Sequence, residues 1–454
     1  MEVLRPVYIP DKQHKSKRNI IVSLTKAEKI KLLKNPKVKD IVLKNELDNM
    51  NIYPTAAQTI NPVLSSFDNQ QHDNWALDYC ADRDGTLYTY RQQGEGVDII
   101  VIDSGVDGDH DEFMESGVSR LQKIEWEAGQ STNKPNHYND EDGHGTAVAS
   151  CAAGKTQGFA RKARIYAIKV FDTDAYTPLG ALQNARDFHN AKTGTSDEGR
   201  PTVVNNSWSY TMDYPTNHPN KSGKHPIQVN SVDAEIESMV DDGMIVISAS
   251  GNESHYIATS SDSKYNEFYY IDSNGDWTDN QSVAQSIVYP NRATPSGAYT
   301  SLCVGSNGEL PSSKSQISYF SNFGTRVDIF APGRAVQCAE KGTTSSLFKI
   351  NGTSFSSPHV AGIIALYVGI YPAADQEEAN AHIESHARQN EISGNLSGAN
   401  NVTAVSSYNG LTVKYNNEMK DVAFVLIKKQ GEWVRLKSIL TNQSNEITPI
   451  LGRA

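Results

Sequence analysis

The sequence is short of cysteine and of long hydrophobic stretches, and each shortage excludes a class of protein. Its four cysteines are too few and too scattered for a disulfide framework or a zinc site, so we expect reduced, buried thiols at Cys80, Cys151, Cys303 and Cys338. The longest apolar run, between Val360 and Tyr371, is shorter than the roughly 20 residues that span a bilayer. We therefore expect no membrane partner.

The first residues also lack the hydrophobic segment of a secretory signal peptide. The stretch from Met1 to Thr25 carries basic side chains such as Lys12, Lys15 and Arg18, but no continuous apolar run. We expect an intracellular or particle-associated protein, for example one carried in a virion, rather than one secreted through the general pathway.

Basic charge is scarce outside the first part of the chain. The 454 residues carry a formal net charge of −11, and residues 1–48 hold 12 lysines and arginines against 6 aspartates and glutamates. The head is therefore +6, which leaves −17 for the remainder. Such an acidic body argues against nucleic acid as a partner. We expect the head and the body to attract each other.

The first 60 residues are predicted to form a small strand–helix–strand unit followed by a linker. Residues 19–23 and 38–43 are apolar and β-branched, whereas residues 25–34 have helical spacing and begin with a capping box. Residues 49–69 resemble a linker, because they contain two prolines and few large apolar side chains. We divide the chain into three parts, namely residues 1–60, 61–402 and 403–454.

From Val97 onward, apolar strands alternate with helices. Near-continuous apolar strands between helices predict an α/β fold with a mainly parallel sheet covered by helices on both faces. The expected strands are 97–102, 165–170, 202–205, 244–250, 302–305 and 327–330, and the expected helices follow 143, 180, 229 and 360.

Two regions depart from this alternation. Residues 254–286 form a polar insertion, and Asp272 to Asp276 within it resembles part of a calcium loop. Its glycine stands at the fourth place instead of the sixth and no glutamate follows at the twelfth, so we predict a turn. Beyond Val402 the tail is predicted to be antiparallel, with a hairpin between residues 422–427 and 433–440.

Three glycine-flanked turns carry the residues that point to chemistry. Asp103 ends an apolar strand, His144 stands between two glycines at a helix start, and Ser354 precedes an apolar helix with Pro358 expected in its first turn. Each alone has an ordinary alternative, as a strand-end cap, a core histidine or a helix N-cap. Together they supply an acid to orient an imidazole, a base and a nucleophile.

These turns resemble the three signature segments of subtilisin-like serine proteases, the S8 peptidases. The matching segments read VIDSGV, HGTAVAS and GTSFSSP, at residues 101–106, 144–150 and 352–358. Their order along the chain, Asp then His then Ser, is the order of that family. The resemblance covers about residues 70–400 and is strongest to the proteinase K branch, because residues 163–170 also match.

The resemblance implies a site for each residue. Asp103, His144 and Ser354 would be the catalytic triad, and Asn252 would donate to the oxyanion. The segment Ser207, Trp208 and Ser209 would pair with the substrate backbone, while Ala249, Ser250 and Gly251 would line the S1 pocket. No cofactor is required for this chemistry. The small, uncharged S1 residues favour broad specificity with an apolar or aromatic P1 residue.

The sequence also departs from the family pattern. Ala147 replaces a second histidine, Ser209 replaces a glycine at the edge of S1, and the 254–286 insertion follows the oxyanion asparagine. The calcium loop between the histidine helix and the next strand is absent, so structural calcium is left open without support.

The resemblance implies a serine endopeptidase that forms an acyl-enzyme on protein or peptide substrates. Residues 20–42 are similar to the second half of the family's inhibitor prodomain, which predicts self-processing and intramolecular inhibition. Two alternatives stay open: an accessory strand–helix–strand unit in place of a prodomain, and a catalytically silent binding or structural protein on the same fold.

Overall fold

The computed structural model describes most of the chain between residues 52 and 448. The described residues are 52–54, 56–59, 74–80, 93–124, 138–171, 175–309, 315–394, 396–399 and 402–404, with the backbone of six short strands between 411 and 448. The unit predicted over residues 19–43 lies outside them. The chain divides into a large unit that reaches Ser407 and a small unit formed by residues 408–454 with residues 89–92.

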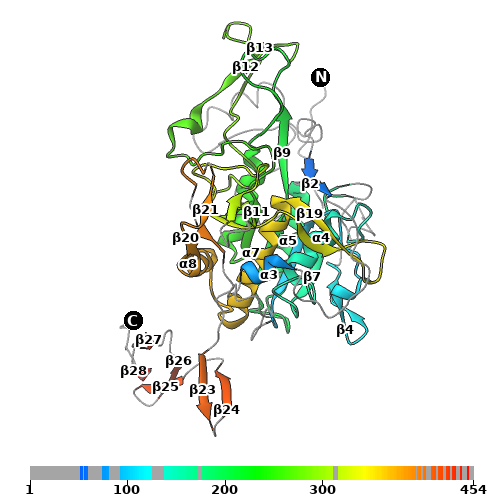
Figure 1. Cartoon of the computed structure of the whole chain (residues 1–454), viewed down its shortest axis with the longest axis vertical. Helices are drawn as coiled ribbons and strands as arrows, with labels where there is room; N and C mark the ends of the chain where they lie inside the picture. The colour runs from blue at the N-terminus through cyan, green and yellow to red at the C-terminus, as the bar shows by residue number, and fades with distance from the viewer. Residues whose placement is uncertain are drawn as a thin grey trace. The chain divides into compact units, whose positions relative to one another are not determined.

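A mainly parallel sheet forms the centre of the large unit (Figure 1). Every neighbouring pair from β6 to β22 is parallel, whereas β20 is antiparallel at the edge and β16 and β21 pair off this path. In spatial order the strands are β20 (Arg388–Gln389), β22 (Val402–Thr403), β17 (Ile329–Pro332), β15 (Leu302–Glu309), β11 (Ile245–Ala249), β8 (Thr202–Asn206), β3 (Asp98–Asp103), β7 (Arg164–Lys169) and β6 (Leu121–Gln122), with β16 (Ser315–Ile317) and β21 (Ile392–Ser393) beside them.

Helices cover both faces of this sheet. On β3, Ile99 and Val101 pack into one core with α4 and α7, whereas Ile100 and Ile102 pack into another core with α5 and α6. Alternate residues of a strand point to opposite faces, so both faces are buried. The helices are α3 (Trp75–Tyr79), α4 (His144–Ala153), α5 (Pro178–Ala191), α6 (Asn230–Asp241), α7 (Thr353–Ile370) and α8 (Gln376–His386). The predicted fold class is confirmed.

Most predicted boundaries agree with the structure to within a few residues, but the start of α7 does not. The sequence predicts that Pro358 lies in the first turn of the helix that contains the apolar run from Val360 to Tyr371. The helix instead begins at Thr353, which places Pro358 in the second turn. This correction matters because proline has no N–H to donate to the carbonyl four residues earlier, which belongs to Ser354.

The insertion at residues 254–286 folds back on a neighbouring hairpin. Its short strands β12 (Tyr269–Ile271), β13 (Trp277–Thr278) and β14 (Ser286–Val288) form their own sheet, after the 3₁₀ helix η3 (Ser263–Asn266). The ring of His225, on the hairpin of β9 (Trp208–Asp213) and β10 (Lys224–Pro226), bonds the Tyr269 hydroxyl at 2.8 Å. The predicted turn is present, because Asp272 Oδ1 accepts the N–H groups of Asn274 and Asp276.

Two short strands lie where the sequence suggested a linker. Strand β1 (Ile52–Pro54) pairs antiparallel with β9, and β2 (Ala56–Thr59) pairs antiparallel with β19 (Leu347–Gly352). In turn, β19 pairs with β18 (Val336–Ala339). The remaining short elements of the large unit are η2 (Asp111–Phe113), β4 (Met114–Glu115) and β5 (Val118–Ser119).

The small unit consists of antiparallel hairpins. The predicted hairpin around residues 428–432 exists with shorter strands, whereas Val422 belongs to a different hairpin and pairs with Leu411. The strands are β23 (Leu411–Tyr415), β24 (Glu418–Val422), β25 (Leu426–Lys429), β26 (Glu432–Arg435), β27 (Leu440–Thr441) and β28 (Ile447–Thr448).

Candidate active site

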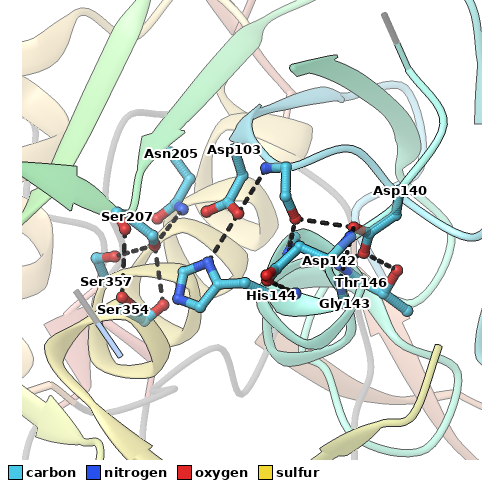
Figure 2. Close-up of polar contacts among 12 residues, drawn as sticks. Asp103, Asp140, Asp142, Gly143, His144, Thr146, Asn205, Ser207, Ser354 and Ser357 are labelled. Atoms are coloured by element: carbon cyan, nitrogen blue, oxygen red, sulfur yellow. Dashed lines mark hydrogen bonds and ion pairs between the residues drawn. The ribbon is translucent and has the colours of Figure 1, made fainter. Parts of the chain in front are cut away.

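Asp103 and His144 form a buried hydrogen-bonded pair. Asp103 is the last residue of β3 and His144 is the first residue of α4. Asp103 Oδ1 lies 2.7 Å from His144 Nδ1 and accepts the Ser104 N–H at 2.7 Å (Figure 2). A carboxylate can only accept, so Nδ1 carries the hydrogen and Nε2 keeps the basic lone pair. Nε2 is buried and has no hydrogen-bond partner among the described residues.

Burial and charge act in opposite directions on this pair. Burial raises the pKa of Asp103, and the attraction of His144 offsets only part of that rise. Burial lowers the pKa of His144, but the Asp103 charge and hydrogen bond outweigh it, so the pKa of His144 lies above its ordinary value of 6.5. The Asp103 charge and hydrogen bond therefore stabilise the imidazolium, the form that a histidine reaches when it acts as a general base.

The carboxylate of Asp140 holds the loop that precedes His144. Oδ1 accepts the Ser104 hydroxyl at 2.9 Å and the Gly143 N–H at 2.8 Å, and Oδ2 accepts the Thr146 N–H at 2.9 Å and the Thr146 hydroxyl (Figure 2). Ser104 Oγ in turn accepts the Gly145 N–H at 2.8 Å. This network ties the chain after Asp103 to the first turn of α4.

A glycine allows that close approach. A Cβ atom at Gly145 would lie 2.0 Å from the carbonyl oxygen of Gly105, well inside van der Waals contact. Helix α4 can therefore meet the end of β3 only with glycine at position 145. The glycine after His144 therefore has a steric reason in this chain.

Ser354 lies at the start of α7, opposite the end of β8. Its Oγ donates to the Ser207 carbonyl at 3.2 Å, and the far side of the His144 ring faces it (Figure 2). Its own carbonyl would normally accept from residue 358, which is proline. Instead that carbonyl accepts the Ser207 hydroxyl at 2.8 Å, and Asn205 Nδ2 donates to the same hydroxyl at 2.8 Å. Ser207 thus replaces the helix bond that Pro358 removes.

Asn252 is held at one end of its amide. It follows β11, and its Oδ1 accepts both the N–H and the hydroxyl of Thr353, each at 3.0 Å. Its Nδ2 is buried and has no partner among the described residues. An NH₂ group in that state can donate to an oxygen carried by a ligand. Thr353 directly precedes Ser354, so Asn252 is tied by these hydrogen bonds to the turn that carries Ser354.

The predicted substrate-binding residues lie at the ends of two sheet strands. One group begins directly after β8 and runs into β9, and it consists of Ser207, Trp208 and Ser209. The other group is residues 249–251, of which Ala249 is the last residue of β11. The Trp208 side chain is fully buried with Tyr210 in the core, so Trp208 can meet a ligand only through its backbone. Its partner in the structure is β1, which pairs with residues 208–210.

Sequence reasoning missed three residues at this site. Asp140 and Thr353 were not singled out, and the packing of Phe355 on His144, with ring centroids 5.5 Å apart, was not foreseen. The available signal was position, because Asp140 stands four residues before His144 in a run of acidic residues and Thr353 stands beside Ser354. Ala147 stands where the family pattern has a second histidine. It lies on α4, and its side chain is fully buried in the core.

Residues 94–414 match the model of the subtilase family. The chain is 29% identical over 301 residues to the subtilisin-like proteinase Spm1 of Pyricularia oryzae, and this alignment covers 65% of this chain and 46% of Spm1. It is 26% identical over 352 residues to a cuticle-degrading serine protease of Arthrobotrys oligospora, in an alignment that covers 76% of this chain and 71% of that protease. Subtilisin-like protease 8 of Trichophyton verrucosum is 29% identical, covering 70% and 56%.

The fold is similar to that of a cold-adapted subtilisin-like serine proteinase of known crystal structure. The TM-score is 0.51 at 24% identity, and the match covers 74% of this chain and 98% of the other. Against several of the relatives found by sequence the chain spans only about half of their length, for example 46% and 56% of two of them.

Proposed function

The chain belongs to the subtilase family, and from this membership and the geometry of its site we propose that it is a serine endopeptidase acting through an acyl-enzyme. One observation carries the proposal: two buried atoms near Ser354, His144 Nε2 and Asn252 Nδ2, have no partner in the described part of the chain. The His144 ring faces Ser354 (Figure 2), and the Asn252 amide is bonded through its oxygen to Thr353, the residue before Ser354. What distinguishes these two atoms is their chemistry: His144 Nε2 can take a proton from a serine hydroxyl, and Asn252 Nδ2 can donate to a developing oxyanion.

The mechanism assigns one step to each side chain. Ser354 Oγ turns from the Ser207 carbonyl, loses its proton to His144 Nε2 and attacks the peptide carbonyl. Asn252 Nδ2 and the Ser354 N–H hold the oxyanion. His144 then protonates the leaving amine, and water repeats the sequence to release the acyl group. Asp103 holds the imidazole tautomer throughout and stabilises the imidazolium.

A fluorophosphonate probe tests this directly, because it labels only an activated serine. Wild type should gain one adduct on Ser354, and Ser354→Ala should gain none. Ser356→Ala is the matched control, since Ser356 lies two residues further along α7 and is also fully buried. A folded wild type that never labels would favour the alternative of a silent binding protein.

We also propose that the chain processes its own N-terminal part. The support comes from β1 and β2, which flank the nucleophile (Figure 1 shows β2 beside β19). Pro54 lies opposite Trp208, the residue after Ser207, and Ala56 lies opposite Gly352, two residues before Ser354. Backbone pairing on both sides of a nucleophile is how an extended peptide substrate binds to a strand edge.

The register indicates which bond is attacked. A single residue, Thr55, separates the two strands in the sequence. Ser207, whose carbonyl accepts the Ser354 hydroxyl, directly precedes Trp208, the β9 residue opposite Pro54, so an extension of the antiparallel register would bring Thr55 to Ser207. The Thr55–Ala56 bond is therefore the proposed cleavage site. A threonine at P1 departs from the apolar or aromatic residue expected from the sequence. Ser209, bulkier than the glycine of the family pattern, is consistent with an S1 pocket that accepts this smaller side chain.

Intact mass and N-terminal sequencing test this proposal. Wild type should begin at Ala56, and Ser354→Ala should remain full length. Ala56→Pro is a second variant, because a proline after the scissile bond removes its N–H and should leave the chain uncut at this position. Wild type that labels with the probe and still begins at Met1 would overturn self-processing and leave the peptidase proposal standing.

We further propose that residues 1–48 act as an inhibitor of the processed enzyme. Their +6 charge against the −17 of the remainder would draw the two together. A separately made 1–48 peptide should inhibit in trans, and inhibition should weaken as salt screens the attraction. Absence of inhibition at low salt would favour the accessory-unit alternative.

A further inference from the structure

Two cysteines from distant parts of the sequence meet behind the site. Cys151 lies on α4 and Cys338 on β18, 187 positions apart, and their sulfur atoms are 3.3 Å apart. Both side chains are fully buried, and both thiols are free. We propose that this pair is an oxidative modification site, at which a peroxide closes a disulfide between α4 and β18.

The backbone around the pair is already in place for this bond. Ser150 and Ala339, the residues next to the two cysteines, are joined by a hydrogen bond of 3.0 Å from the Ala339 N–H to the Ser150 hydroxyl. A disulfide needs sulfur atoms about 2.0 Å apart. The sulfurs must therefore approach by little more than 1 Å, a movement that rotation of the two cysteine side chains can provide while the bond from Ala339 to the Ser150 hydroxyl stays in place.

The two thiols differ in acidity, which gives each a role. Burial raises the pKa of Cys151, but the hydrogen bond with Cys338 and the neighbouring His359 ring outweigh burial and lower the pKa to about 6. The pKa of Cys338 is raised, by burial first and by Cys151 second. Cys151 is therefore the thiol that attacks, and Cys338 the thiol that resolves.

His359 is oriented to take the proton of Cys151. Its Nδ1 lies 3.1 Å from the Pro332 carbonyl, which can only accept, so Nδ1 carries the hydrogen. Nε2 is the basic atom of the ring, and the ring lies close enough to the Cys151 thiol to hydrogen-bond it and lower its pKa. The side chain itself is fully buried on α7.

The oxidation balances with one molecule of hydrogen peroxide. Cys151 gives its proton to His359, and the thiolate attacks one peroxide oxygen to form a sulfenic acid; the hydroxide released leaves as water after regaining that proton. Cys338 then attacks the sulfenic sulfur, the S–S bond forms, and the second hydroxide leaves as water with the Cys338 proton. Two thiols and one peroxide thus give one disulfide and two waters. Peroxide is a small oxidant, which suits a pair that is closed to solvent.

The bond would join the elements that carry the proposed base and nucleophile. Helix α4 begins at His144, and the β18–β19 hairpin leads through Gly352 to Ser354. A cross-link across 187 positions strongly restricts the unfolded chain. We expect oxidation to raise the melting temperature by roughly 5 to 10 °C, from the usual stabilisation by a disulfide in a domain of a few hundred residues.

The experiment uses the full chain carrying Ser354→Ala, so that self-digestion does not interfere. After treatment with equimolar hydrogen peroxide, thiols are blocked with N-ethylmaleimide in denaturant and the intact mass is measured. Two of the four thiols should resist blocking, a non-reduced digest should contain a Cys151–Cys338 peptide, and the melting temperature should rise until a reductant is added. Cys303→Ser is the matched control, because Cys303 is a buried free thiol in a different core cluster and its loss should leave the cross-link unaffected.

Cys151→Ser and Cys338→Ser should each abolish both the cross-link and the rise in melting temperature. Four blockable thiols after treatment, or oxygen added to Cys151 without a cross-link, would overturn the proposal. A cross-link that forms but leaves the melting temperature unchanged would contradict its structural consequence. None of these measurements depends on peptidase activity.

Discussion

The loop before α4 and the end of β11 satisfy their key polar side chains in different ways. Asp140, in the loop, has both carboxylate oxygens bonded to groups of the protein. Asn252, after β11, has its oxygen bonded to Thr353 and its NH₂ unbonded among the described residues. A side chain whose polar atoms are all hydrogen-bonded within the fold can position its neighbours. A side chain with one bonded and one unbonded polar atom can also bind a substrate.

His144 belongs with Asn252 in this comparison. One ring nitrogen is bonded to Asp103 at 2.7 Å, whereas the other is buried and unbonded in the described part of the chain. In both residues the bonded atom fixes the orientation of the unbonded one. The difference between these half-bonded side chains and the fully bonded Asp140 predicts how much each residue contributes to catalysis.

The largest loss is expected for His144→Ala, which removes the proposed base. Without it, kcat should fall by about 10⁵- to 10⁶-fold, as for a member of a triad that acts as a unit. Steady-state kinetics on an ester or peptide substrate, with folding checked by circular dichroism, measures this. A variant that keeps more than a small fraction of wild-type kcat would exclude His144 from the chemistry.

Asp103→Asn should lower kcat by about 10⁴-fold, because an amide no longer fixes the imidazole tautomer. It should also change the pH profile. Only neutral His144 can accept a proton, so kcat/KM falls as the pH drops through the pKa of His144, which Asp103 holds above 6.5. Removing the charge lowers that pKa, so the acid limb should move to lower pH. An acid limb that stays in place would contradict the pairing.

Asn252→Ala tests the half-bonded amide. It should lower kcat by about 10²- to 10³-fold and leave KM nearly unchanged, since the amide binds the oxyanion and not the ground-state carbonyl. Thr353→Val is a companion variant that keeps the backbone donor to Asn252 and loses the hydroxyl donor. Its loss in kcat should be smaller than that of Asn252→Ala, and equal losses would argue that orientation accounts for the whole effect.

Asp140→Asn tests the fully bonded carboxylate. An amide NH₂ would meet the N–H of Thr146, and the start of α4 should shift, so we expect a loss of about 10- to 100-fold in kcat. Asp142→Asn is the matched control: it removes the same charge from the same loop, and its oxygen can still accept the His144 N–H as Asp142 does at 3.0 Å. Both changes remove a charge that raises the pKa of His144, so both should move the acid limb to lower pH. Only Asp140→Asn should lower the pH-independent maximum of kcat. Equal maxima in the two variants would show that Asp140 acts through its charge alone.

The smallest effect is expected from metal removal. The proposed mechanism uses side chains alone, so a chelator should leave kcat unchanged. Thermal denaturation with and without the chelator separates structure from chemistry. A lower melting temperature with unchanged kcat would indicate a structural metal, and a direct loss of kcat in the folded protein would contradict the mechanism.

The parts of this protein that the sequence predicts are those encoded by neighbouring residues. The apolar run before Asp103 and the glycines around His144 are local patterns that predict one strand and one helix, and the alternation of such segments from Val97 onward predicts the α/β fold. Local pattern also predicted the turn at residues 272–276, because an aspartate can bond the backbone two residues ahead.

Contacts between distant segments could not be predicted in the same way. The bond from Ser207 to the Ser354 carbonyl compensates for Pro358, and it joins residues 147 positions apart. Strand β2 has little strand propensity of its own, with two alanines and a glutamine among four residues, and β1 ends in a proline; both strands pair with distant segments, β9 and β19. Residues 19–43 lie outside the described part of the chain, so the strand–helix–strand unit there stays a prediction.

The most direct test of the account is to trap the acyl-enzyme. Wild type is mixed with an excess of an activated ester, quenched in acid within the first turnover, and examined by intact mass and peptide mapping. The account predicts one acyl group per chain, on Ser354, with Asn252→Ala acylating more slowly and Ser354→Ala never acylating. Turnover of the ester with no acyl group on Ser354, or with the acyl group on another residue, would contradict it.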